Sequence, residues 1–174
     1  MDTGLYVLWG HNPEHSDFPL QLALEENLKK GSKLVVIDPK RIALAKKADM
    51  YLPIRPGTDG ALALALMHVI IKEDLYDKDF VERWTHGFEK LVSHVERYTP
   101  EWAEGITWVP AEDIRKLARL YAGAESASIF QGTNTQDQTA NGTQNSRAFS
   151  ILQIITGNIN NRGGWVISPR LRLT

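Results

Sequence analysis

Two short apolar runs near the start of the chain, joined by an amphipathic segment, constrain the fold more than any other feature. The runs are Leu5–Trp9 and 34–37 (Leu-Val-Val-Ile), and continuous apolar runs of this length are typical of parallel strands buried on both faces. Between them, 17–30 carries leucines on one side and two lysines before Gly31, as an amphipathic helix does. Strand, helix and strand in this order predict a βαβ unit, and so an α/β domain with a mostly parallel sheet.

The rest of the chain supplies further strands and helices for such a sheet. The run 127–130 is a third strand candidate and 50–54 a weaker fourth. The segment 60–73 is apolar nearly all round, which predicts a buried helix that Thr58 or Asp59 could cap. Residues 77–122 are interpreted as a helical layer or insertion, and a last helix is expected near 142–156. The helices expected within 77–122 are 78–84, 88–98, 100–104 and 111–122.

Composition excludes several classes of protein. A chain of 174 residues with 43% apolar and 24% charged side chains fits one soluble domain, here 1–174. The net charge of −1 lacks the basic excess of a nucleic-acid-binding domain. The absence of cysteine removes disulfides, thiolate metal sites, iron–sulfur ligation and a cysteine nucleophile. The longest apolar stretch, 61–71, is too short to span a membrane, so no direct membrane insertion is expected.

Four polar segments follow the four predicted strands. They are 10–16, 38–41, 55–59 and 132–141, each rich in Gly, Asn, Asp, Pro, Thr or Gln. In open α/β sheets, ligands bind in the crevice beyond the carboxyl ends of the strands. Four polar loops at one such edge predict a nucleotide cradle.

Each loop also has a purely structural interpretation. The loop 10–16 leads into a predicted helix whose N–H groups favour phosphate, but it could be a simple turn with Ser16 as helix cap. Asp38 suits a ribose contact as well as a turn before Pro39. Asp59 could accept two N–H donors from guanine, or only cap a helix. The segment 132–138 is long and polar enough to favour a functional role.

The histidines do not indicate catalysis. His11 and His15 lie four residues apart on a predicted loop, a spacing that permits a metal pair but does not require one. His68 is interpreted as a satisfied residue on a packed helix. No serine stands in a strand–elbow motif of the kind that Ser–His–Asp catalysis uses. No catalytic residue and no metal ligand are therefore assigned.

Taken together and in order, the loops resemble the dimethyl-sulfoxide-reductase family of molybdopterin oxidoreductases. The resemblance rests on Trp-Gly-His-Asn-Pro-Glu-His-Ser (9–16), Leu-Val-Val-Ile-Asp-Pro-Lys-Arg (34–41) and the segment 48–65, which contains Ile-Arg-Pro-Gly-Thr-Asp-Gly. It continues to Thr-Gly-Asn (156–158) and Gly-Gly (163–164), and so covers practically the whole chain. Formate dehydrogenases, acetylene-hydratase-like proteins and thiosulfate or polysulfide reductases share this segment.

The resemblance implies a Rossmann-like, three-layer domain that holds guanosine and diphosphate of a molybdopterin guanine dinucleotide chelating Mo or W. It assigns the residues by loop, in four groups along the cofactor. Those along the diphosphate and ribose are Gly10, Asn12, Pro13 and Ser16; those at the ribose or guanine are Asp38 with Lys40 or Arg41; those that clamp guanine are Pro56, Gly57 and Asp59; and those toward the pterin are Gly132, Thr133 and Gln138.

The chain departs from the family pattern at three points. Lys40 stands where the family usually has arginine, and lysine lacks the planar fork. The loop after Gly132 is one residue longer than in formate dehydrogenases, so Gln136 and Gln138 compete for one role, and the spacing to Asn141 favours Gln138. The iron–sulfur domain, the metal ligand and the C-terminal β-barrel domain of the family have no counterpart in this sequence.

We therefore expect a cofactor-binding domain of a larger oxidoreductase, with the iron–sulfur and β-barrel domains of the same polypeptide as its partners. The fragment alone is expected to hold no metal and to be inactive. The alternatives are a stand-alone regulatory nucleotide-binding module and a structural domain that has lost its ligand. The sequence leaves the substrate, the metal and the cellular compartment open.

Overall fold

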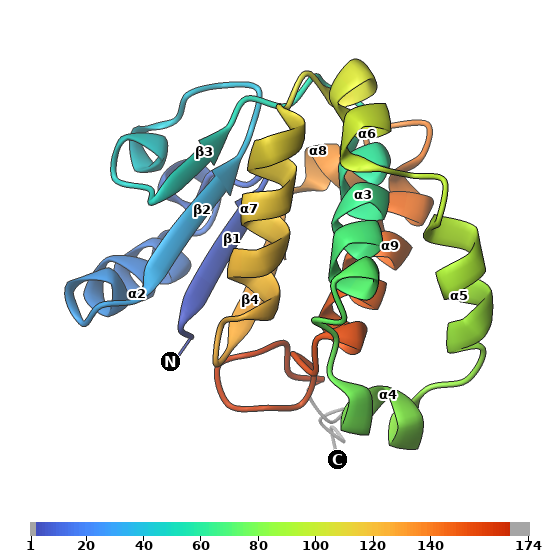
Figure 1. The fold of residues 1–174 in the computed structure, drawn as a ribbon. Coiled ribbons are helices and arrows are strands. Elements are labelled where there is room, and N and C mark those ends of the chain that lie inside the picture. Colours follow the sequence, from blue (N-terminus) through green and yellow to red (C-terminus); the bar gives the residue numbers. More distant parts are fainter. Residues whose placement is uncertain (1–2, 168–174) are drawn as a thin grey trace, which may run out of the picture.

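The computed structural model describes residues 3–167 and contains one parallel four-stranded sheet. The strands are β1 (Leu5–Trp9), β2 (Lys33–Ile37), β3 (Met50–Leu52) and β4 (Ala127–Gln131), in the spatial order β3-β2-β1-β4. Every pairing is parallel, so the predicted α/β fold with its βαβ unit is confirmed. The carboxyl ends of all four strands consequently meet at one edge of the sheet (Figure 1).

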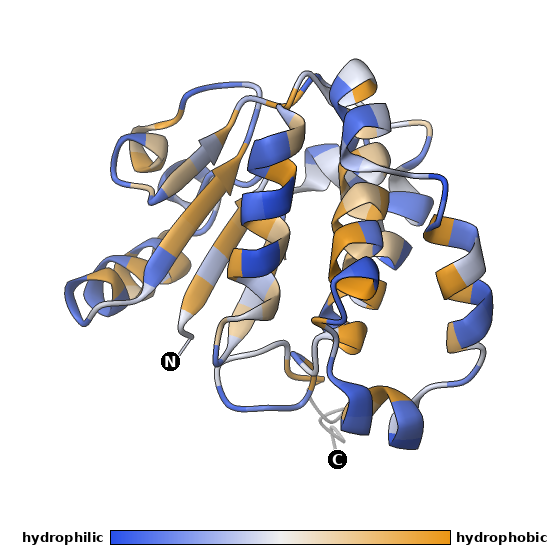
Figure 2. Ribbon diagram, viewed as in Figure 1, coloured by the Kyte–Doolittle hydropathy of each residue, from blue (hydrophilic) through white to orange (hydrophobic). Residues whose placement is uncertain are grey.

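Helices cover both faces of the sheet, because side chains along a strand point alternately to opposite faces. On one face Leu5, Val7 and Trp9 belong to the larger apolar core, shared with helices α3, α7 and α9. On the other face Tyr6 and Leu8 pack with α2 and the 3₁₀ turn η1. Figure 2 shows the strands as largely apolar along their length. The two cores give the three-layer arrangement expected from the resemblance.

Most helices lie where the sequence predicts them. The longer ones are α2 (Phe18–Lys29), α3 (Asp59–Lys72), α7 (Ala111–Ala122) and α9 (Gly142–Ile155), and the shorter ones between α3 and α7 are α4 (Lys78–Trp84), α5 (Phe88–Val95) and α6 (Pro100–Thr107). Helix α3 is buried along much of its length and contacts α5, α6, α7 and α9. Helices α5, α6 and α7 of the segment 77–122 thus pack beside α3, and α4 contacts α9. Among residues 3–167 no helix is long and apolar enough to cross a bilayer.

The structure corrects four local predictions. The loop 10–16 contains a one-turn helix, α1 (Pro13–Ser16), and the loop 132–141 contains another, α8 (Thr133–Gln136). Asp17, not Ser16, caps α2, because its side chain accepts a hydrogen bond from the Leu20 amide. η1 (Ala43–Lys46) was also not predicted.

The N-cap predicted at Thr58 or Asp59 is confirmed in position at Thr58, but it forms without a side-chain capping bond. The Thr58 hydroxyl donates to the Arg55 carbonyl oxygen. Asp59, the first residue of α3, turns its carboxylate toward β1 instead. The Asp59 side chain is therefore available for a role other than capping the N-terminus of α3.

Candidate functional site

Two adjoining hollows lie at the edge of the sheet where the strands end. The first, which we call the Asp59 hollow, has a volume of about 510 Å³ and takes its walls from the loops after all four strands. The second, the Asn12 hollow, has a volume of about 560 Å³ and is lined by the loops after β1, β2 and β4. Gly10, Asp38, Pro39 and Asn134 line both. The four predicted loops therefore do converge at this edge, where they surround two hollows that share these four residues.

The Asp59 carboxylate is fixed by the core. Trp9 ends β1 as a fully buried side chain against the ring of Phe149, with 4.4 Å between ring centroids. Its indole Nε1–H donates to Asp59 Oδ1 at 2.9 Å. A buried indole N–H needs an acceptor, so the interior tryptophan and the aspartate satisfy one another. Only Oδ1 is used in this bond, and Oδ2 has no side-chain donor within residues 3–167.

The Asp59 hollow is acidic. Asp59 is buried, and that burial raises the pKa of its carboxyl above the ordinary 3.8, while the Trp9 hydrogen bond opposes the shift and the charge of Asp38 adds to it. Burial also raises the pKa of Asp38, whose carboxylate accepts the Lys40 amide hydrogen at 2.7 Å. Among residues 3–167, no lysine, arginine or histidine lines this hollow. It is therefore suited to a group that offers hydrogen-bond donors.

The raised pKa of Asp59 predicts how stability depends on pH. A carboxyl whose pKa is higher in the folded chain than in the unfolded chain favours folding below its ordinary value, and this contribution is lost as pH rises through the folded value. Asp59→Asn removes the ionisation and keeps an oxygen for Trp9. We expect its free energy of unfolding to rise relative to the unchanged chain as pH increases from 4 to 8, as measured by urea unfolding at each pH. A difference that does not change with pH would contradict the assignment.

The loop after β4 packs so closely against the loop after β1 that no side chain would fit between their backbones. Gly132 N–H donates to the Trp9 carbonyl oxygen, and a Cβ at Gly132 would lie 1.8 Å from the Gly10 carbonyl oxygen. Gly10 itself has a φ of +58°, and a Cβ there would meet Thr135 at 2.5 Å. Thr135 is buried and is held by three hydrogen bonds. Its backbone N–H and its hydroxyl both donate to the Gly132 carbonyl oxygen, and the Asn145 side-chain amide donates to the Thr135 carbonyl oxygen. These contacts fix the floor between the two hollows.

The Asn12 hollow has mixed charge. His11, His15 and Lys40 line it together with Asp17 and Asp38. Burial lowers the pKa of His11, and the charge of Asp17 partly opposes this. The Asn12 side-chain oxygen is buried with no partner among the described residues. An unpaired buried acceptor of this kind costs roughly 1–3 kcal/mol, which a ligand that supplies a donor would recover.

The predicted phosphate contact at a helix N-terminus has little support in the geometry of this loop. Helix α1 is only four residues long. At the start of α2, the side chain of Asp17 already caps the helix and Pro19 has no N–H. A second anion would meet the charge of Asp17 there. Backbone amides of a long helix therefore cannot be the reason for any phosphate binding in this loop.

Most residues assigned by the resemblance line one of the hollows. Arg41 does not: it is exposed and its guanidinium lies 5.9 Å from the centre of the Tyr51 ring. Pro13 is buried within α1 and lines neither hollow. Gln138 lines the Asp59 hollow and Gln136 lines neither. The remaining assigned residues are placed as follows: Pro56, Gly57 and Asp59 in the Asp59 hollow; Asn12, Ser16, Lys40, Gly132 and Thr133 in the Asn12 hollow; Gly10 and Asp38 in both.

Three residues of the hollows were not singled out from the sequence. Gln131 ends β4, one residue beyond the predicted strand, and its side-chain oxygen is buried without a described partner. The Thr139 hydroxyl, in the Asp59 hollow, is also buried without a partner among the described residues. Asn134 lines both hollows. All three lie in or beside the polar segment 132–141, so the segment was predicted but its individual contributors were not.

Comparison with known proteins gives a consistent result. The family model described as molybdopterin oxidoreductase matches residues 1–167. Formate dehydrogenase H of Escherichia coli is 42% identical over 159 residues, which is 91% of this chain and 22% of the relative. The probable oxidoreductase YoaE of Bacillus subtilis is 39% identical over 165 residues, 95% of this chain and 24% of the relative.

A solved structure is similar to this chain in both fold and sequence. Acetylene hydratase from Pelobacter acetylenicus superposes with a TM-score of 0.86 at 39% identity, over 93% of this chain and 22% of that chain. The present chain thus spans roughly a quarter, or slightly less, of each of these relatives.

Proposed function

The chain belongs to the molybdopterin oxidoreductase family, and we propose that, as part of a larger enzyme, it holds the guanosine diphosphate portion of a molybdopterin guanine dinucleotide. The observation that carries the proposal is the fixed, buried carboxylate of Asp59 in an acidic hollow. Guanine offers two adjacent N–H donors along one edge. A carboxylate is the matching acceptor, because its two adjacent oxygens carry about four lone pairs and the Trp9 bond uses only one of them.

The rest of the nucleotide fits the connected hollows. Asp38 lines both, at the end of β2, where an acid in a dinucleotide-binding sheet accepts ribose hydroxyls. A base in the Asp59 hollow with its ribose at Asp38 would direct the diphosphate into the Asn12 hollow. There Lys40 supplies a positive charge, and the NH₂ group of the Asn12 side chain can donate a hydrogen bond to a phosphate oxygen. Gly57, with open space around its Cα, lets a flat base approach the backbone.

The metal and the reaction belong to the parent enzyme in this proposal. When bound, the pterin-held Mo or W would supply electron transfer, or transfer of an oxygen or sulfur atom. The residues of this chain would bind and orient the nucleotide end. The proposed partners are the iron–sulfur and C-terminal β-barrel domains of the same polypeptide, which would enclose the cofactor from its other side.

We expect the chain to prefer GDP over ADP by about tenfold or more. Adenine presents an acceptor at the edge where guanine presents donors, so the acceptor positions of Asp59 that the Trp9 bond leaves free would find no donor, at a cost of roughly 1–3 kcal/mol. Absolute affinity should be weak, about millimolar, because the chain alone leaves one side of the nucleotide in water. Chemical-shift titration of the ¹⁵N-labelled chain measures dissociation constants in this range and locates the perturbed residues.

The outcome of this titration is decisive. Guanine preference with shifts at Trp9 Nε1 and in the loops after β2 and β3 would support the proposal. Equal affinity for GDP and ADP, or shifts confined to another surface, would refute it.

A further inference from the structure

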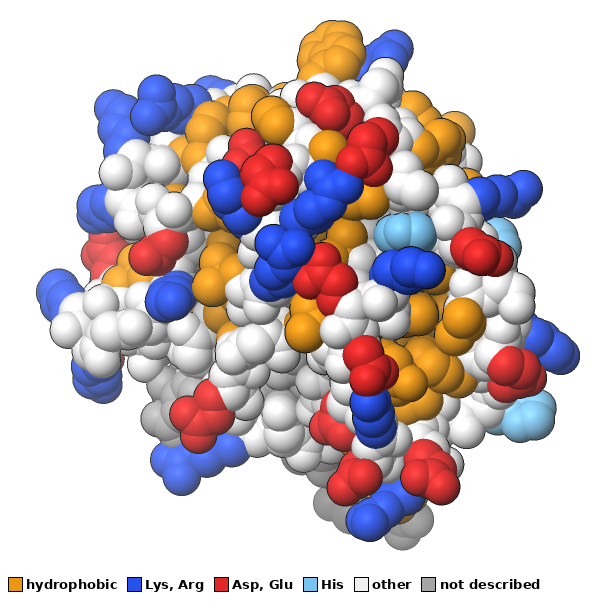
Figure 3. All heavy atoms as spheres, viewed as in Figure 1, with side chains coloured by type: hydrophobic (Ala, Val, Ile, Leu, Met, Phe, Trp, Pro, Cys, Tyr) orange, Lys and Arg blue, Asp and Glu red, His pale blue; other side chains and the backbone are white. Residues whose placement is uncertain are grey.

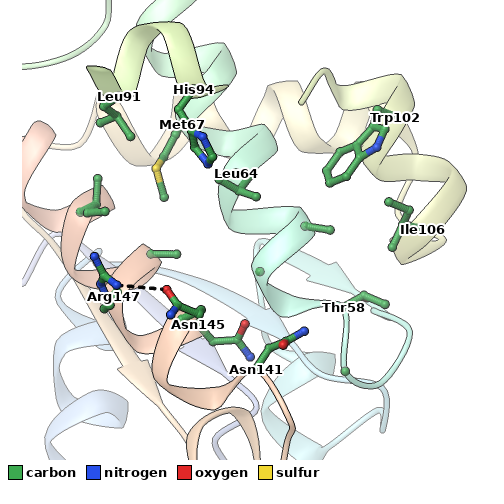
Figure 4. A pocket seen from close by; sticks show the side chains of 16 residues that line it. Thr58, Leu64, Met67, Leu91, His94, Trp102, Ile106, Asn141, Asn145 and Arg147 are labelled. Carbon is green, nitrogen blue, oxygen red and sulfur yellow. Dashed lines mark hydrogen bonds between the residues drawn. The ribbon is translucent and has the colours of Figure 1, made fainter. Parts of the chain in front are cut away.

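A third hollow lies beside the Asp59 hollow and has a different chemistry. It has a volume of about 570 Å³, lies between α3, α5, α6 and α9, and shares only Gly57 and Asn141 with the Asp59 hollow. We call it the Trp102 hollow. Figure 4 shows Leu64, Met67 and Trp102 on one side of it and Asn141 and Arg147 on the other. Its volume is within the usual range of small-molecule sites, about 300–1,000 Å³.

One wall of the Trp102 hollow is apolar and suits a flat ring. The indole of Trp102 is 36% exposed, although the ring of Tyr98 packs against it at 4.7 Å. Leu64, Met67 and Ile106 continue this wall. A thioether and an indole make favourable contacts with aromatic rings. Figure 3 shows apolar side chains gathered between α3 and α5, on a surface where charges of both signs otherwise intermix.

The opposite wall carries positive charge without a counterion. Arg147 is the charged residue of this wall, and among residues 3–167 no aspartate or glutamate lines the hollow. His94 lies on the other side, beside Met67 (Figure 4). Arg147 makes a long bond of 3.3 Å to the Gln144 side-chain oxygen and no ion pair among residues 3–167. Gln144 and Asn141 add amide groups on the same wall. The charge is thus opposite in sign to that of the neighbouring Asp59 hollow.

We infer that the Trp102 hollow is a second binding site, which takes a planar aromatic carboxylate. The ring would lie against Trp102 and Met67, and the carboxylate would accept hydrogen bonds from the Arg147 guanidinium, whose fork matches carboxylate geometry. This inference goes beyond the proposed nucleotide site and does not depend on it, because it rests on a separate lining.

The test compares three probes of one shape and different charge. They are 2-naphthoate, neutral 2-naphthalenemethanol and cationic 2-naphthylmethylamine, each titrated against the ¹⁵N-labelled 174-residue chain. We expect 2-naphthoate to bind with a dissociation constant of about 1 mM, as ligand efficiency suggests for its size. The alcohol should bind about fivefold more weakly, since a partly exposed ion pair contributes modestly. The Trp102 Nε1–H signal should shift with the bound ring.

Charge variants separate this site from non-specific attraction. Arg147→Gln should remove the preference for naphthoate over the alcohol, and Arg147→Glu should reverse it in favour of the amine. Arg83→Gln, at an exposed arginine of α4 that lines none of the three hollows, is the matched control and should change nothing. Thermal unfolding of each variant verifies that the fold is kept.

The result that would overturn the inference is equal binding of the three probes by the unchanged chain, or no binding of any of them. Either would make the hollow an uncharged apolar surface, suited to covering by another polypeptide segment. A charge preference that Arg147→Glu leaves unaltered would also overturn it. None of these results bears on GDP binding, which depends on Asp59.

Discussion

Gly132→Ala is expected to destabilise the chain by about 3 kcal/mol, the upper end of the usual cost of overpacking. The reason is space and not backbone conformation, since Gly132 has an ordinary φ of −81°. A Cβ there would lie 1.8 Å from the Gly10 carbonyl oxygen and 2.7 Å from the Gly10 carbonyl carbon. These are backbone atoms at the end of β1 and cannot turn away. The loops after β1 and β4 would have to separate, and the floor of both hollows would separate with them.

Urea unfolding of the variant measures the effect, with Gly105→Ala as the matched control. Gly105 lies inside α6, is exposed, and has no neighbouring atom within 4 Å of an added Cβ. Alanine there should stabilise the chain by about 0.5–1 kcal/mol, because glycine loses more backbone freedom on folding. GDP binding should be lost in Gly132→Ala and kept in Gly105→Ala. Equal stability of the two variants would mean that the two loops are not in close contact.

Asp59→Asn is expected to exchange the base preference of the chain from guanine to xanthine. The asparagine oxygen can still accept the Trp9 Nε1–H, so the side chain should stay in place. Its NH₂ group then stands where the carboxylate offered an acceptor, and it opposes the N–H donors of guanine. Xanthine has a carbonyl oxygen at the position of the guanine amino group and can accept that NH₂. One hydrogen bond to guanine is lost and one to xanthine is gained, at roughly 1–3 kcal/mol each. The affinity for GDP should therefore fall, and that for xanthosine diphosphate rise, by about tenfold or more.

The measurement is a pair of titrations with GDP and xanthosine diphosphate. Asp38→Asn is the control, because Asp38 is the other carboxylate of the hollow and is proposed to contact ribose, which both nucleotides share. It should weaken GDP and xanthosine diphosphate alike. Asp59→Ala should lose guanine preference without gaining xanthine. If Asp59→Asn weakens both nucleotides equally, Asp59 does not read the base.

Several features of this protein follow from local sequence. Continuous apolar runs such as Leu5–Trp9 can be satisfied only by burial on both faces, which forces a parallel sheet covered by helices. Because the strands are parallel, the loop after every strand lies at the same edge of the sheet. For this reason the four polar loops could be assigned to one region of the molecule, and the family resemblance of their residues pointed to the same edge.

Side-chain direction within those loops could not be predicted in the same way. The sequence left open whether Lys40 or Arg41 approaches the site. In the folded chain Lys40 lines the Asn12 hollow, whereas the Arg41 guanidinium lies over the Tyr51 ring. Asp17, not Ser16, caps α2 because a turn of helix, α1, comes first and shifts the cap by one residue. Such choices depend on how the loops pack in the folded chain, which the pattern of residue types does not specify.

The sequence by itself thus determined the layered α/β fold, the edge that carries the polar loops and the candidate residues there. Only the tertiary structure decided which of these residues share a hollow. Strand register places Gln131 opposite Trp9, and Trp9 in turn holds Asp59, 50 residues away, by a single hydrogen bond. A continuous apolar run is a local property, which a short segment of sequence reveals. The pairing of a buried donor with its acceptor is settled only when the whole core has packed, because the cost of leaving either one unpaired exists only after water has been excluded.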